Sequence, residues 1–122
     1  MPTAPDRILR AALTGTASHC VDLMLPLDEA IAAIREVSDR PDLLADVAGQ
    51  LAGATDPAWF DWSRRRAQAR LLVAAGADRS LLRAAVERGR ARLREPIAAD
   101  GEVPVDVDDV VAEIIWPQDP AA

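Results

Sequence analysis

Arginine dominates the chemistry that this chain has available. Ten arginines lie between residues 64 and 94, where only Asp78 and Glu87 oppose them, so this segment has a net charge of +8. The rest of the chain has a net charge of −14, and the sequence contains no lysine. A guanidinium stays charged at neutral pH and presents a rigid fork of donors that fits carboxylates and phosphates. The segment therefore predicts a surface that binds an anion.

Helical spacing selects the candidate binding residues within and before this segment. Successive residues of an α-helix turn by about 100°, so four arginines of residues 79–94 fall along one edge of a helix, beside its apolar stripe. In the preceding helix, two arginines and a tryptophan lie between apolar arcs, where partial desolvation makes the arginines require an acid. The candidates for binding an anionic surface or a partner are Trp59, Arg66, Arg70, Arg79, Arg83, Arg90 and Arg94.

The helix expected over residues 57–75 carries two apolar arcs. Phe60 and Leu71 belong to one arc, and Trp62 and Val73 belong to the other. A helix of this kind is either central in a bundle or shared between the core and a partner, which is the argument for a homodimer. Its opposite side is expected to face solvent with four polar residues, Asp61, Arg64, Arg65 and Gln68.

Three kinds of anion could meet the arginines. The first is the chain's own tail, residues 96–122, which has seven acids and no base. The second is an acidic protein partner. The third is nucleic acid, because residues 67–94 have the order of a helix-turn-helix, with a glycine in the turn, and the acidic tail would then act as a mask. The tail is favoured because segments that are close in sequence tend to be neighbours in space.

Other chemistry has little support in the sequence. The one histidine and the one cysteine are adjacent, at His19 and Cys20, and adjacent residues rarely share a zinc ion. We expect a surface histidine beside a buried thiol. Asp42 and Asp46 have the i, i+4 spacing of an acid–base or metal dyad, but without a partner motif this spacing indicates a solvated helix face. We therefore expect no metal, no cofactor and no catalytic residue, and thus a protein that is not an enzyme.

Apolar periodicity predicts an all-α chain. Helices are expected over residues 6–13, 27–37, 41–53, 57–75, 79–94 and 107–115, with a short turn over residues 18–23. They form a single-domain bundle of about five helices over residues 1–95. The acidic tail, residues 96–122, contributes a short amphipathic helix at about residues 107–115 that docks on the bundle.

Capping residues and helix breakers set the expected ends of these helices. Glycines end the first and third helices, at Gly15 and Gly53, and Gly76 takes the left-handed position after the fourth. The fifth helix is expected to end before Pro96. The residues suited to begin helices are Pro41, Asp56, Pro57, Asp78 and Asp106.

Composition bounds the class of protein. The chain has 122 residues, half of them apolar, which suits one domain. No stretch approaches the roughly 18 apolar residues of a membrane span, and the first residues lack the apolar run of a signal peptide. A lone cysteine does not form an intrachain disulfide, so a cytoplasmic protein is expected. The bias toward arginine and alanine is typical of a GC-rich bacterial genome.

These observations predict a non-catalytic small helical protein that mediates protein–protein association, either with itself or as an adaptor or regulator. The alternative is a nucleic-acid-binding regulator that uses the pair of helices at about residues 67–94. Small-molecule binding or enzyme activity is the third candidate, and no membrane association is expected.

Overall fold

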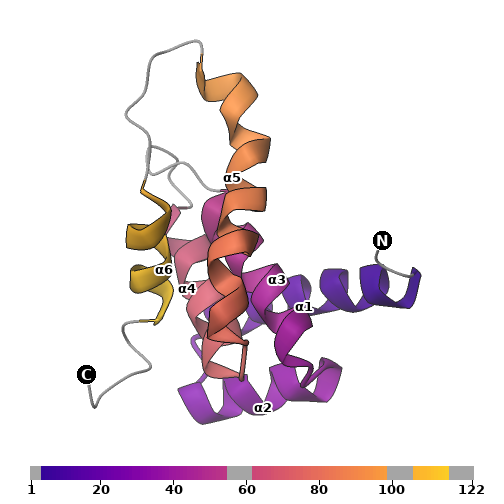
Figure 1. Cartoon of the computed structure of the whole chain (residues 1–122). Coiled ribbons are helices and arrows are strands. Elements are labelled where there is room, and N and C mark those ends of the chain that lie inside the picture. The colour runs from indigo at the N-terminus through magenta and orange to yellow at the C-terminus, as the bar shows by residue number, and fades with distance from the viewer. Residues whose placement is uncertain (1–3, 55–61, 99–105, 116–122) are drawn as a thin grey trace.

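The structure is a computed structural model that describes residues 4–54, 62–98 and 106–115. These residues form six α-helices and one 3₁₀ helix and contain no strand, which confirms the predicted all-α, single-domain bundle (Figure 1). In chain order the elements are α1 (Ala4–Asp22), α2 (Leu27–Val37), α3 (Pro41–Gly53), α4 (Trp62–Ala74), η1 (Arg79–Leu81), α5 (Leu82–Ala98) and α6 (Val107–Ile115).

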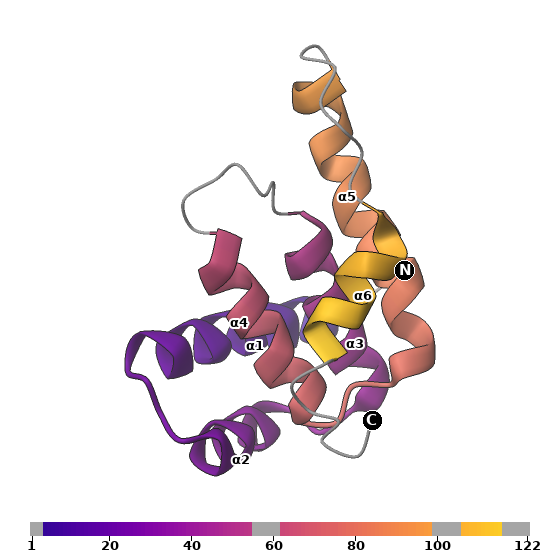
Figure 2. The same ribbon diagram turned by 90° about the vertical axis from the view of Figure 1, so that its left-hand side faces the viewer.

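Helix α3 forms the centre of the bundle. From Leu43 to Gly53 every residue except Gln50 is buried, and the other helices that lie against it are α1, α4, α5 and α6. Figures 1 and 2 show α3 in the middle of the helices. Its sequence explains this position, because a helix that is apolar or small on nearly all sides must be covered on all sides.

Three glycines bring the backbones of α3 and α5 into direct contact. A Cβ atom on Gly49 would overlap that of Ala85, and one on Gly53 would overlap the carbonyl oxygen of Val86. On the facing helix, a Cβ on Gly89 would lie 2.5 Å from the carbonyl oxygen of Gln50. The crossing therefore requires glycine at these positions, for close packing and not for turning the chain.

The predicted end of the first helix near Gly15 is wrong. Helix α1 continues through this glycine to Asp22. Leu13, Ala17 and Cys20 recur on one face and are buried, and the packing of this face outweighs the roughly 1 kcal/mol that a glycine costs inside a helix.

The predicted end of the fifth helix before Pro96 is also wrong, because α5 extends to Ala98. A proline removes one backbone hydrogen bond and can bend a helix without ending it. The last turns of α5 extend beyond the rest of the bundle in both ribbon views (Figures 1 and 2).

Several predicted capping positions are confirmed. Pro41 begins α3, and Gly76 has a positive φ of 122° after α4. The Asp78 carboxylate accepts a hydrogen bond from the Ser80 amide at 3.0 Å. The Asp106 carboxylate likewise accepts one from the Asp108 amide at 2.8 Å. The start predicted for the fourth helix at Asp56 and Pro57 lies outside the described residues.

Helix α4 is covered by the chain itself. It lies against α1, α2, α3 and α6, and of the described members of its two apolar arcs Ala69 and Val73 are buried and Leu71 packs partly buried against the core. The homodimer stays a prediction. The predicted polar face of α4 does not lie uniformly in solvent, because Gln68 is only 4 % exposed. Arg64 is exposed, whereas Phe60, Asp61 and the side chain of Trp62 are not among the described groups.

Within the described ranges, no helix has the length and apolar character needed to cross a membrane.

Candidate functional site

Helix α6 lies across the two helices that carry most of the arginines. It contacts α4 and α5, and to a smaller extent α3, and Figure 2 shows it crossing in front of α3 between them. Val110 and Ile114, one turn apart, are buried in the core. A nine-residue helix is too short to be stable by itself in water, so α6 depends on this surface for its order.

Glu113 of α6 connects to both arginines that the sequence places between apolar arcs. Its carboxylate pairs with the guanidinium of Arg66 and lies 3.5 Å from a terminal nitrogen of Arg70. Arg70 also donates from Nε to the backbone carbonyl of Glu113 at 3.1 Å. One residue of α6 is thus held by two successive turns of α4, and Glu113 is an anion that both arginines meet.

The pair between Arg66 and Glu113 is buried on the arginine side. Arg66 is 2 % exposed, and this burial lowers its pKa, while the charge of Glu113 and the hydrogen bond to it act in the opposite direction. Arginine remains protonated at neutral pH even so. A buried ion pair rarely adds stability beyond what apolar residues of the same size would give, and its best-attested use is to specify a pairing. We therefore expect this pair to select which helix sits here.

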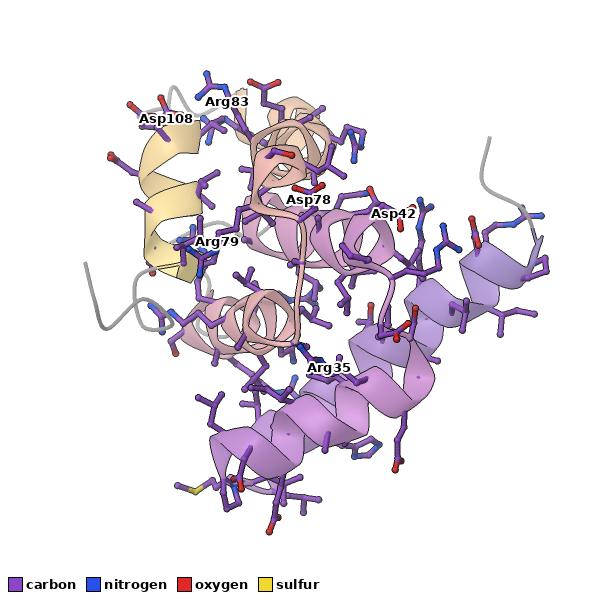
Figure 3. The ribbon with its side chains drawn as sticks, turned by 60° about the horizontal axis from the view of Figure 1, so that its bottom comes forward. Arg35, Asp42, Asp78, Arg79, Arg83 and Asp108 are labelled. Atoms are coloured by element: carbon purple, nitrogen blue, oxygen red, sulfur yellow. The ribbon has the colours of Figure 1, made fainter. Side chains whose placement is uncertain are left out.

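A second contact joins α5 to the start of α6. Arg83 pairs with the carboxylate of Asp108 and lies 3.6 Å from Glu87, one turn further along α5. The Arg83 and Asp108 side chains are 57 % and 71 % exposed, so solvent screens this pair and it contributes little stability. Figure 3 shows Arg83 and Asp108 facing each other at one edge of the molecule.

The seven predicted site residues do not form one cluster. Arg66 and Arg70 contact Glu113 near the end of α6, and Arg83 contacts Asp108 at its start; these three arginines, which all hold α6, are called the arginine surface from here on. Arg79 is exposed in η1, and Arg90 is partly buried further along α5. Trp59 and the side chain of Arg94 lie outside the described residues, so their place at the site stays a prediction.

A buried carboxylate that the sequence interpretation missed lies on the other side of α5. Asp46 is 8 % exposed, and the expectation of a solvated face is wrong for it. Its Oδ1 accepts hydrogen bonds from Arg88 at 2.7 Å and from Gln50 at 2.8 Å, and its Oδ2 lies 2.6 Å from the guanidinium of Arg10. This acid therefore ties α1, α3 and α5 together, and its position in the buried run of α3 was the signal available.

Asp42 and Asp46 do not share a site. The Asp42 carboxylate is exposed and accepts hydrogen bonds from Arg40 at 2.8 and 3.3 Å, which lowers its pKa. Arg40 also reaches Asp6 of α1 at 2.7 Å. Arg40, just before α3, thus pairs with Asp42 in the first turn of α3 and with Asp6 of α1. Among the described residues no group of histidine, cysteine and acidic side chains is arranged to hold a metal ion.

Arg35 has a capping role that its spacing in the sequence does not reveal. Its Nε donates to the carbonyl oxygen of Ala75 at 2.7 Å, at the end of α4 (Figure 3). The last carbonyls of a helix lack partners within the helix and carry partial negative charge, so a cation from α2 satisfies one of them. The contact fixes α2 against α4.

His19 and Cys20 take the positions expected of them. His19 is exposed and Cys20 is buried, and burial raises the pKa of the Cys20 thiol. A raised pKa leaves less of the reactive thiolate at neutral pH, so this cysteine is a packing residue.

An exposed clasp joins the end of α1 to α4. Arg64 donates to both oxygens of the Asp22 carboxylate, at 2.9 and 2.7 Å, and to the hydroxyl of Ser18 at 2.6 Å. The hydrogen bond from Arg64 is the largest cause that lowers the pKa of Asp22 below its ordinary value of 3.8.

The clasp predicts a small, acid-dependent stability. Because the pKa of Asp22 is lower in the folded chain, its contribution is present above the ordinary value of 3.8 and is lost as the pH falls through the folded-state value. Asp22→Asn should lower the melting temperature slightly at neutral pH and make it less sensitive to acid below about pH 4. Thermal unfolding across this range checks it, and a variant whose melting temperature depends on acid as steeply as the wild type would contradict it.

The described residues thus define an all-α bundle in which two basic helices hold an acidic helix of the same chain. Comparison with known proteins finds no matching family model and no significant match among curated proteins or solved structures. The function of the arginine surface is therefore inferred from the residues of this chain.

Proposed function

We propose that this protein is a non-catalytic helical protein that associates with a protein partner through the arginine surface. The observation that supports this most is the docking of α6, since a helix carrying carboxylates is already bound there through Arg66, Arg70 and Arg83. The arginine and alanine bias and the single cysteine favour a bacterial, cytoplasmic setting as part of the proposal.

The charges of the arginine surface are suited to recognition. Arg83 is more than half exposed, so a partner reaches it while α6 is still docked, whereas Arg66 is covered. An exposed arginine at the edge of the surface attracts an acidic partner and speeds its association. An arginine that is covered by the partner then forms an ion pair away from water, which slows dissociation. This arrangement supports an adaptor or regulator that takes up an acidic protein or a second copy of itself.

The test compares the full chain with a variant that reverses the exposed charge. Sedimentation of the wild type over micromolar concentrations, alone and with acidic partner candidates, should show larger species that salt weakens. Arg83→Glu should reduce them. Arg7→Glu, an exposed arginine of α1, changes the net charge equally and should leave association unchanged. Equal association of wild type and Arg83→Glu under all conditions would contradict the proposal.

Nucleic-acid binding remains the alternative, with less support from the geometry. In the described residues α4 and α5 do not pack on each other, and both lie against α3, unlike the packed pair of a helix-turn-helix. A heparin column and a labelled DNA library test it on the full chain. Salt-sensitive retention of the chain, together with binding of the DNA, would favour this alternative.

A further inference from the structure

We propose that the arginine surface binds an acidic amphipathic helix of another protein, and that α6 is an internal copy of this ligand, which the partner displaces. The inference rests on the proposed function and names the chemistry of the partner. It goes further because it assigns α6 the role of an occupant of the surface.

Several contacts that join the other helices do not involve α6. The glycine crossing joins α3 to α5, Asp46 ties α1, α3 and α5 together, and Arg35 of α2 caps α4. Helix α6 adds two buried residues, Val110 and Ile114, and three partly buried ones that pack against the core, Val107, Val111 and Ile115. It is therefore an element that can leave while these contacts between the other helices remain.

The bound face of α6 defines what a partner must present. Two apolar residues one turn apart, Val110 and Ile114, enter the core, and Val107, Val111 and Ile115 pack partly buried against it. An acid two residues before Val110, Asp108, reaches α5. An acid directly before Ile114, Glu113, reaches α4. A partner helix with carboxylates and apolar side chains in this spacing makes the same contacts.

The burial of Arg66 favours a helix over nucleic acid. This guanidinium is 2 % exposed and lies beside a core that Val110 and Ile114 complete. A phosphate backbone can supply the anion, but it has no apolar side chains to replace these two residues. A ligand that covers Arg66 removes its solvent, and a covered charge without a well-placed acid is costly, so the surface favours a ligand that brings a carboxylate and apolar groups together.

Displacement has to overcome the advantage of a tethered helix. An occupant on the same chain acts at an effective concentration in roughly the millimolar range. The α6 of a second copy has identical contacts and gains nothing over the chain's own α6. A foreign helix that makes more or better-placed contacts than α6 can displace it. The apparent affinity of this helix rises with the fraction of molecules in which α6 is undocked.

The test measures binding of a fluorescently labelled peptide with the sequence of residues 106–115, by anisotropy, to the full chain. In Glu113→Gln the chain's own α6 loses its charge pair with Arg66, while the peptide keeps the acid. We expect this variant to bind the peptide at least about tenfold more tightly than the wild type, because more of its surfaces are open. Asp109→Asn removes the same charge from an exposed position of α6 and should bind as the wild type does.

A second variant keeps the test possible if Glu113→Gln does not fold. Asp108→Asn loosens α6 at its exposed contact with Arg83, and about a threefold gain in peptide affinity is expected because this pair is screened. Far-UV circular dichroism confirms that each variant remains helical. A peptide with glutamine in place of its glutamate should bind Glu113→Gln more weakly than the unchanged peptide does, because it lacks the acid that pairs with Arg66.

Each contrary outcome overturns the inference in a different way. If neither loosened variant binds the peptide more tightly than the wild type, α6 is not a displaceable occupant. If the wild type forms dimers that the labelled peptide dissociates, the occupant is the α6 of a second copy, and if Glu113→Gln binds labelled DNA in place of the peptide, the occupant is nucleic acid. Association that still depends on Arg83 in sedimentation would leave the proposed function standing in the first case, whereas its loss would remove both.

Discussion

Gly53→Ala and Gly89→Ala are each expected to destabilise the folded chain by about 2–3 kcal/mol. A Cβ at position 53 would overlap the carbonyl oxygen of Val86, and one at position 89 would lie 2.5 Å from the carbonyl oxygen of Gln50. Both obstacles are backbone atoms of a facing helix, so relief requires α3 and α5 to move apart along their tightest contact. Urea unfolding followed by circular dichroism measures the loss.

Gly15 supplies the matched control. It also lies inside a helix, but a Cβ there would have no atom within 4 Å. Gly15→Ala should therefore stabilise the chain by about 0.5–1 kcal/mol, because alanine favours the helix and no contact opposes it. If all three substitutions changed stability in the same direction, the close approach of α3 and α5 would be refuted.

Asp46→Asn is expected to cost about 2–3 kcal/mol of unfolding free energy. The change keeps the shape of the side chain but removes the charge that Arg10 and Arg88 share. The arginines then face each other across a neutral amide that is itself buried. The loss stays below that of a fully buried pair because the Arg88 side chain is 55 % exposed and can turn toward solvent.

Asp42→Asn tests whether burial, and not charge alone, decides the effect at Asp46. Asp42 lies one turn earlier on α3 and pairs with Arg40, but both side chains are exposed, and such a pair is worth less than about 1 kcal/mol. Urea unfolding of both variants in the same buffer checks the difference. Equal losses at the two positions would contradict the role given to the Asp46 cluster.

The sequence predicted those helices and helix starts that depend on apolar spacing and capping residues. The apolar spacing of residues 27–37 predicts α2, and Pro41, Asp78 and Asp106 begin helices because proline and aspartate satisfy the needs of a first turn. These signals act over three or four residues. The helix that passes through Gly15 shows their limit, since burial of α1 against the bundle overrides a local preference.

Only part of the candidate site could be predicted from the sequence. Spacing identified Arg66 and Arg70 as cations in need of an acid, because it shows which residues share a face of one helix. It does not show which helix covers that face, so Glu113 could be named only as one of several acids in the tail. Asp46 was missed for the same reason, because its burial depends on α1 and α5 closing over α3.

Amide hydrogen exchange of α6 tests the account most directly. If α6 is an occupant held by Glu113, its amides in Glu113→Gln should exchange at least about tenfold faster than in the wild type, while those of α3 and α5 stay protected. Asp109→Asn should leave α6 unchanged. Exchange of α6 that is equal in Glu113→Gln and wild type, or that rises only together with α3 and α5, would show that α6 is an inseparable part of the core.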